Sequence, residues 1–298
     1  MKKSLTVAAV TAIAAASVAL TGCMSNNDSG TDTAAEPGRY ASVNGLNMYY
    51  EVHGEANGQP PLVLLHGGLS ATGTSFGELL PGLTEGRQVI SIEQQAHGHT
   101  ADIDRPVTIT TMADDTLDLL DQIGVEQADF FGYSIGAGIA LEIEVSHPEK
   151  VRKAVLATVS YNTSGLQPGN SEGVGTITSE MMDGTPFKDE FIAVAPHPDQ
   201  FDKTLQRMKE TAASTINYAP EQIKGIQTPT LIIAADNDIV TPEHTTEMYR
   251  LLGGGIEGTQ GLPKSQLAVI PGTSHLTLVH QPEVLLPIIG SFLDAGGE

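Results

Sequence analysis

Six short apolar runs alternate with helical segments along this chain. The runs are rich in β-branched residues and are bounded by glycine, proline or polar residues: Leu62–Leu65, Val89–Ile92, Ala128–Phe131, Ala154–Val159, Thr230–Ala235 and Leu267–Ile270. Short, mainly apolar runs of this kind are typical of strands buried on both faces. Their alternation with helices predicts an α/β fold, in which a mostly parallel sheet has helices on both faces.

Three further segments complete the predicted fold. Ser42–Tyr50 has Asn44-Gly45 at its centre and predicts a hairpin, because Asn-Gly readily takes the positive φ angles of a tight turn. Met112–Ile123 has apolar residues at helical spacing, and its aspartates are expected on a solvated face: Asp114, Asp115, Asp118 and Asp121. Residues 161–225 contain no strand-like run and predict a helical cap over a core formed by residues 40–160 and 226–298.

The N-terminus has the layout of a bacterial export signal. Lys2 and Lys3 precede an uncharged, alanine-rich stretch that ends in Leu20-Thr21-Gly22-Cys23. This ending resembles a lipobox, which implies that residues 1–22 are removed and that Cys23 receives a lipid. Residues 23–39 are polar and predict a flexible tether from that lipid anchor. The expected location is therefore the bacterial cell membrane or outer membrane, although an ordinary cleaved signal or an uncleaved anchor would fit the same layout.

Charge and cysteine content exclude several functions. The 298 residues have a formal net charge of −21, from 36 acidic and 15 basic side chains. Nucleic-acid binding is not expected, because phosphate neutralisation requires clustered lysine and arginine. A single cysteine can form neither an intramolecular disulfide nor a thiolate zinc site.

Ser134 is the candidate nucleophile. It lies in Gly132-Tyr133-Ser134-Ile135-Gly136, a G-x-S-x-G motif directly after one predicted strand and before a predicted helix. Glycines two residues on either side allow the chain to reverse sharply and expose the serine oxygen. The spacing alone is weak evidence in a glycine-rich chain, but its strand-turn-helix setting makes the motif specific.

A serine hydroxyl needs a base and an orienting acid. His275 follows the last predicted strand and is the expected base, with His280 as the alternative. Asp238 and Asp236 both follow the strand Thr230–Ala235, and we prefer Asp238 because it lies further into the turn. The order Ser, Asp, His is that of α/β-hydrolases.

The oxyanion of a tetrahedral intermediate needs two hydrogen-bond donors. The backbone N–H of Ile135, at the start of the helix, is one candidate. The other is Gly68 in His66-Gly67-Gly68, which directly follows the strand Leu62–Leu65. His66 is expected to orient this loop rather than to act as a base.

Together these motifs resemble α/β-hydrolase fold serine hydrolases of the esterase, lactonase and carbon–carbon bond hydrolase kind, over roughly residues 40–293. The resemblance implies an eight-stranded sheet whose second strand is antiparallel, a small helical cap after the sixth strand, and no cofactor. The chain departs from the common Asp-x-x-Gly-x-Gly-x-Ser pattern, with Glu93, Ala96, Gly98 and Thr100 at its fixed positions, and has Ala235 where glycine is frequent. Related dehalogenases and epoxide hydrolases have an aspartate nucleophile at this turn, so Ser134 argues against both activities.

The remaining features are less specific. His97-Gly98-His99 lacks a third ligand at a supporting spacing, so no metal is expected. His197 is expected in a surface loop. Five cap residues either line the substrate pocket or pack the cap on the core, and the sequence does not decide between the two: Met181, Met182, Phe187, Phe191 and Phe201.

The expected activity is hydrolysis of a small ester, thioester or lactone through an acyl-enzyme, with a small carbonyl compound as the binding partner. Ser134, His275 and Asp238 form the expected triad, and the Gly68 and Ile135 amides the oxyanion hole. Carbon–carbon bond hydrolysis and perhydrolysis are alternatives on the same fold. A non-catalytic lipoprotein that binds a ligand under the cap is the alternative from another class. The oligomeric state is not indicated.

Overall fold

The computed structural model describes residues 38–214, 216–255 and 262–296. The expected signal segment, Cys23 and most of the tether lie outside these residues, so they stay predictions. The strand β1 (Gly38–Val43) already begins at Gly38 and pairs Gly38 with Glu51 and Arg39 with Tyr50. The expected tether of residues 23–39 is therefore two residues too long at its end. No helix among the described residues is long and apolar enough to cross a membrane.

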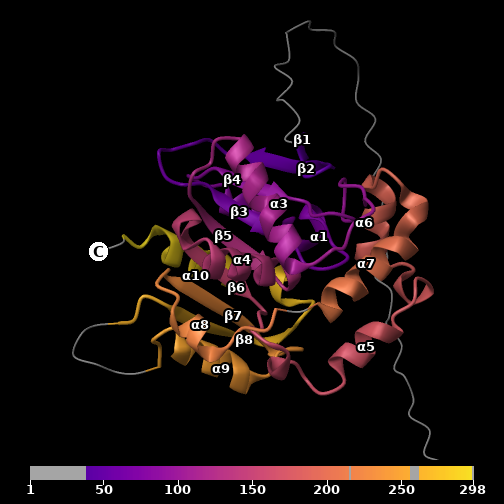
Figure 1. The fold of residues 1–298 in the computed structure, drawn as a ribbon. Coiled ribbons are helices and arrows are strands. Elements are labelled where there is room, and N and C mark those ends of the chain that lie inside the picture. Colours follow the sequence, from indigo (N-terminus) through magenta and orange to yellow (C-terminus); the bar gives the residue numbers. More distant parts are fainter. Residues whose placement is uncertain (1–37, 215, 256–261, 297–298) are drawn as a thin grey trace, which may run out of the picture. The chain divides into compact units, whose positions relative to one another are not determined.

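The core is an eight-stranded sheet in the order β1-β2-β4-β3-β5-β6-β7-β8 (Figure 1). After β1 the strands are β2 (Leu46–His53), β3 (Leu62–Leu65), β4 (Val89–Ile92), β5 (Ala128–Tyr133), β6 (Val151–Ala157), β7 (Thr230–Asn237) and β8 (Gln266–Ser274). β2 is antiparallel to both of its neighbours, whereas β3 to β8 are parallel. The predicted fold class, including the antiparallel second strand, is confirmed.

The hairpin between β1 and β2 also forms where Asn44-Gly45 predicted it. Both residues have positive φ angles, 49° at Asn44 and 86° at Gly45. The two strands are longer than the hairpin predicted at Ser42–Tyr50, because their pairing continues to Gly38 and Glu51.

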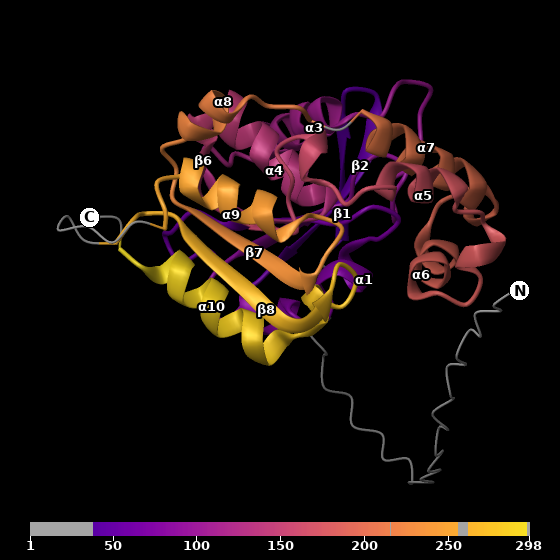
Figure 2. The ribbon, with the colours of Figure 1, turned by 90° about the horizontal axis from the view of Figure 1, so that it is seen from below.

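Helices cover both faces of the sheet, as Figure 2 shows. One face packs against α3 (Ile109–Gln122), α4 (Ile135–Ser146), α8 (Pro220–Lys224) and α9 (Pro242–Leu251). The other packs against α1 (Thr72–Phe76), α2 (Leu80–Leu83) and α10 (Pro282–Asp294). Alternate residues of each central strand face opposite clusters, with Phe130 in the first and Phe131 in the second. Both faces of the strands are therefore buried, which explains their continuous apolar runs.

The segment between β6 and β7 contains the cap, and its described residues form no strand. Its helices are α5 (Asn170–Thr176), α6 (Pro186–Val194), α7 (Phe201–Ala213) and α8. Ile223 of α8 is fully buried in the sheet core with Met248 of α9. The cap expected at residues 161–225 therefore consists of α5 to α7, and α8 covers the sheet.

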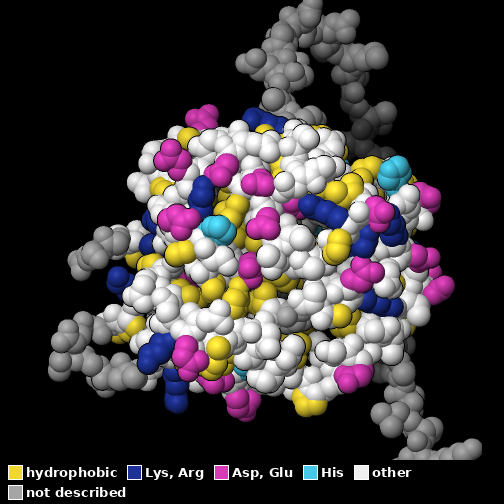
Figure 3. All heavy atoms as spheres, viewed as in Figure 1, with side chains coloured by type: hydrophobic (Ala, Val, Ile, Leu, Met, Phe, Trp, Pro, Cys, Tyr) yellow, Lys and Arg dark blue, Asp and Glu magenta, His cyan; other side chains and the backbone are white. Residues whose placement is uncertain are grey.

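One predicted surface residue is buried. Asp115 is 1% exposed and accepts hydrogen bonds from Arg105 and from Asn44 in the hairpin turn. The expectation that all four aspartates of α3 face solvent is wrong for Asp115, because a cation and an amide from other segments cover it. The other three are exposed. Figure 3 shows acidic side chains spread over the visible face.

Glu144 is a buried acid on α4 that provides a pH-dependent prediction. It is 1% exposed, and the only hydrogen bond to its carboxyl group from the described residues comes from Thr230. Burial raises its pKa to about 8, from an ordinary value of 4.5. At a pH between these two pKa values, the Glu144 carboxyl keeps its proton in the folded chain but has released it in the unfolded chain. Folding therefore becomes less favourable as the pH rises through this window.

Replacing Glu144 by Gln removes this titration and is close to isosteric. The variant is expected to gain stability over wild-type protein by a few kcal/mol between pH 5 and pH 8, at roughly 1.4 kcal/mol per pH unit. Urea unfolding at several pH values measures the difference. If the difference in stability between the variant and wild-type protein stays constant over this pH range, Glu144 is ionised in the folded protein.

Candidate active site

Ser134 occupies a sharp turn between β5 and α4. Its φ of 55° and ψ of −115° are unusual for a residue with a side chain. A Cβ on Gly132 would lie 2.2 Å from the carbonyl oxygen of Gly136, and a Cβ on Gly136 would lie 1.9 Å from that of Leu65. Both motif glycines are therefore required by backbone contacts.

Three side chains from distant parts of the sequence form one hydrogen-bonded chain. Ser134 Oγ is 2.9 Å from His275 Nε2, and His275 Nδ1 is 2.7 Å from Asp238 Oδ1. An ionised carboxylate only accepts hydrogen bonds, so the His275 proton lies on Nδ1 and leaves Nε2 to accept from the serine hydroxyl. This arrangement can remove a proton from Ser134 as its oxygen attacks a carbonyl.

The alternative acid and base lie elsewhere. Asp236 accepts hydrogen bonds from the backbone N–H groups of Gly272, at 2.9 Å, and Thr273, at 3.1 Å. The hydrogen bonds from these N–H groups lower the pKa of Asp236, and the bond from Gly272 has the larger effect. Asp236 therefore holds the segment that leads to His275 rather than the imidazole itself. His280 is paired with Glu78 on the surface.

Tyr133 is a residue of the site that the sequence analysis did not identify. Its hydroxyl donates to the backbone oxygen of His275 at 2.7 Å, and so ties the histidine loop to the serine turn. Burial, followed by the charge of Asp238, raises the pKa of Tyr133, which keeps it protonated as a donor. It fills a variable position of G-x-S-x-G, so the motif gave no signal for this role.

Gly68 and Ile135, the expected oxyanion donors, lie side by side. A Cβ on Gly68 would be 2.7 Å from Ile135 Cδ1 and 3.2 Å from Met208 Cγ. Ile135 is the first residue of α4, where backbone N–H groups have no acceptor within the helix. Both residues line the same cavity as Ser134.

His66 fixes the start of the loop that contains Gly68. Its Nε2 is 3.0 Å from the backbone N of Gln94, and its Nδ1 is 2.8 Å from the backbone O of Gly67. A backbone N–H can only donate, so Nε2 is unprotonated and Nδ1 donates to Gly67. Burial lowers the pKa of His66, which favours this neutral form. These contacts support the expected orienting role.

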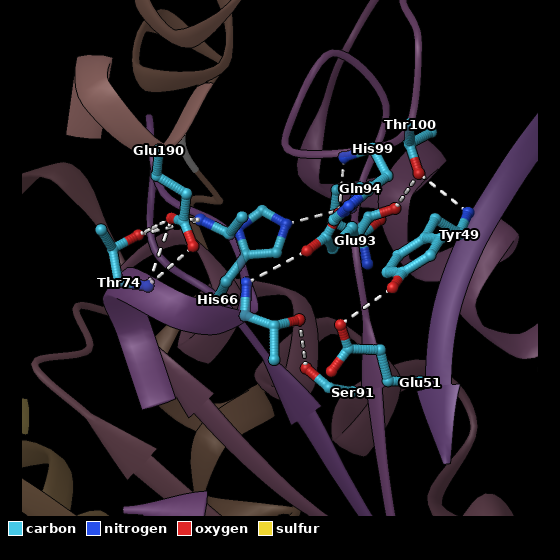
Figure 4. A network of polar contacts seen from close by, with 12 residues as sticks. Tyr49, Glu51, His66, Thr74, Ser91, Glu93, Gln94, His99, Thr100 and Glu190 are labelled. Carbon is cyan, nitrogen blue, oxygen red and sulfur yellow. Dashed lines mark hydrogen bonds and ion pairs between the residues drawn. The ribbon is translucent and has the colours of Figure 1, made fainter. Parts of the chain in front are cut away.

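Two carboxylates hold α1, the helix that follows the loop containing Gly68, as Figure 4 shows. Glu93 accepts from the backbone N–H groups of Thr72, at 3.2 Å, and His99, at 2.6 Å, and from the His99 ring. Burial raises the pKa of Glu93, but the His99 hydrogen bonds outweigh this and leave it lowered. Glu190 of cap helix α6 accepts from the N–H groups of Ala71 and Thr74, each at 3.1 Å. The cap is thereby tied to the segment that follows Gly68.

The other histidines in this region have structural partners. His97 is buried, its Nδ1 is 2.9 Å from the Gln95 backbone oxygen, and burial lowers its pKa to about 3. The described part of the chain contains no group of three or more side chains that could hold a metal ion. His197 is exposed, as expected.

A cavity of about 700 Å³ extends from Ser134 and His275 beneath the cap. Its lining is mostly apolar, with Leu69, Ile109 and Val159 from the core and Val174, Met182 and Phe187 from the cap. Two of the five uncertain cap residues thus line it. Phe191 and Phe201 pack against each other instead, with ring centroids 5.4 Å apart, and Met181 is exposed.

Comparisons with known proteins identify the family of this chain. The pattern of the Alpha/beta hydrolase family matches residues 62–287. The uncharacterized hydrolase YugF of Bacillus subtilis is 27% identical over 87% of this chain and 99% of its own. The putative carbamate hydrolase RutD of Agrobacterium fabrum is 21% identical over 83% and 98%.

Solved structures share the fold. The meta-cleavage product hydrolase CumD of Pseudomonas fluorescens superposes with a TM-score of 0.70 at 18% identity, over 86% of this chain and 97% of its own. The enol-lactonase of Burkholderia xenovorans gives a TM-score of 0.63 at 20% identity, over 86% and 99%. The family pattern covers most of the chain, and this protein belongs to the Alpha/beta hydrolase family of enzymes.

Proposed function

We propose that this enzyme is a serine hydrolase that cleaves a small ester, thioester or lactone through an acyl-enzyme. The main support is the hydrogen-bonded chain from Ser134 through His275 to Asp238 at one end of an apolar cavity. One relative is named for a carbamate and one structural neighbour for a lactone, and both kinds of compound contain the carbonyl group that acyl transfer requires.

In the proposed reaction, Ser134 Oγ attacks the substrate carbonyl while His275 Nε2 takes its proton. Asp238 stabilises the imidazolium that forms. The Gly68 and Ile135 N–H groups bind the oxyanion of the tetrahedral intermediate. His275 then gives the proton to the leaving oxygen or sulfur, and a water activated by His275 hydrolyses the acyl-enzyme.

The cavity supports a substrate with an apolar portion. Its walls offer few polar groups, so burial of hydrocarbon supplies most of the binding energy there. Because a volume of about 700 Å³ is at the scale of a small organic ligand, a short or medium acyl or alcohol chain fits the proposal better than a polymer.

The proposal is tested with p-nitrophenyl esters of increasing acyl length, together with a thioester and a lactone of matched size. We expect an initial burst of p-nitrophenol, because acylation precedes slower deacylation. The kcat/KM should rise with chain length and then fall once the acyl group exceeds the cavity. Failure to cleave any of these substrates, with no burst, would contradict acyl transfer as the activity.

A further inference from the structure

Thr158 lies beside Ser134 at the carboxyl end of the sheet. Ala157, the last residue of β6, is paired with Tyr133, and its oxygen accepts the N–H of Ser134 at 3.0 Å. The next residue, Thr158, is held on its other side by a 2.8 Å hydrogen bond from its N–H to the Ile233 oxygen. Thr158 also lines the cavity that contains Ser134.

The backbone of Thr158 is strained. Its φ is +57°, a left-handed conformation that β-branched residues rarely adopt. This turn ends β6 at Ala157, so the strand predicted to run through Val159 is two residues too long. Glycine would relieve the strain, and such strain is typically kept at functional sites.

The hydroxyl of Thr158 has no protein partner although it is buried. Thr158 is 5% exposed, and its Oγ1 has no hydrogen bond to any described residue. Three other hydroxyls in the cavity wall have protein partners: Tyr133 donates to His275, Ser160 to Asn162, and Thr211 to Val107. A buried hydroxyl without a partner is costly, and a ligand that bonds to it removes that cost.

We propose that Thr158 is a specificity residue whose hydroxyl binds a second polar group of the substrate. This inference rests on the proposed function. The polar group, a hydroxyl, oxo or amide, lies close to the scissile carbon, because Thr158 and Ser134 follow the paired ends of neighbouring strands. The substrate class narrows to small oxygenated esters, thioesters or lactones with an apolar remainder.

The test compares ethyl butanoate with ethyl 3-hydroxybutanoate and 2-hydroxyethyl butanoate, using the full chain. The two hydroxylated esters place the polar group on the acyl and the alcohol side. Wild-type enzyme is expected to prefer one of them over ethyl butanoate in kcat/KM by about tenfold or more. Thr158→Val keeps the shape but removes the hydroxyl, and should reduce this ratio at least about tenfold.

Two further variants separate a specificity role from a structural one. Thr158→Ser restores a hydroxyl and should keep the wild-type preference. Thr211→Val is the matched control, because Thr211 lines the same cavity but its hydroxyl is bonded to Val107. Its ratio should stay at the wild-type value. A damaged fold would slow all three esters alike and leave the ratio unchanged.

The inference is overturned if wild-type enzyme prefers neither hydroxylated ester, or if Thr158→Val keeps the wild-type ratio. Failure of the proposed function has a different result. In that case wild-type protein and Ser134→Ala would treat ethyl butanoate alike, whatever residue stands at position 158.

Discussion

Replacement of Ser134 by Ala is expected to lower kcat for any cleaved ester by at least about 10⁵-fold. The change removes the oxygen that lies 2.9 Å from His275 Nε2, and no other hydroxyl takes its place in that hydrogen-bonded chain. The same change should abolish covalent labelling by a fluorophosphonate, which reacts with activated serines. Stopped assays and mass spectrometry of the labelled protein measure the two effects.

Ser160→Ala is the matched control for the nucleophile. Ser160 lines the same cavity, but its hydroxyl donates to the Asn162 backbone, so stoichiometric labelling should persist. The double variant that also lacks His275 should lose little more activity than Ser134→Ala alone, because the two side chains act as one unit. Labelling that survives in Ser134→Ala would disprove the assignment of the nucleophile.

Replacement of Asp238 by Asn is expected to lower kcat by about 10⁴-fold. The carboxylate now accepts the proton of His275 Nδ1 at 2.7 Å. The same oxygen also accepts the Ile239 N–H at 2.7 Å. A neutral amide no longer stabilises the imidazolium, and where its nitrogen faces Nδ1 it donates instead and favours the tautomer with the proton on Nε2. That tautomer cannot accept the proton of Ser134. The measurements are kcat and the pH dependence of kcat/KM with a chromogenic ester. The pH dependence shows whether the variant has lost the base.

Asp236→Asn serves as the comparison and should stay within about tenfold of wild-type kcat. Its carboxylate bonds to the backbone of Gly272 and Thr273 rather than to the imidazole, and an asparagine oxygen can still accept from one of them. If the two variants exchanged their effects, Asp236 would be the triad acid.

Local patterns predicted the sheet and the serine turn well. The apolar runs of β3 and β4 coincide with the observed strands Leu62–Leu65 and Val89–Ile92, because strands buried on both faces admit few polar residues. The glycines around Ser134 were also readable, since a sharp backbone reversal excludes side chains whatever the surroundings. These features depend on neighbours in sequence.

Other features of the molecule depend on segments far apart in the chain. The choice between Asp236 and Asp238 follows from which carboxylate meets the Gly272 backbone and which meets His275, 37 residues beyond Asp238. Asp115 is buried because Asn44 and Arg105 reach it from other segments. Phe187 lines the cavity whereas Phe191 and Phe201 pack against each other, and this difference follows from how α6 and α7 meet.

The sequence by itself determined the α/β architecture, the serine turn and the candidate residues of the triad, because strand periodicity and glycine sterics act over a few residues. Only the tertiary structure identified Tyr133 as the anchor of the His275 loop and Thr158 as a buried, unpartnered hydroxyl beside Ser134. Whether a polar atom is satisfied depends on every group that folding brings within about 3 Å of it, and no local pattern encodes that set.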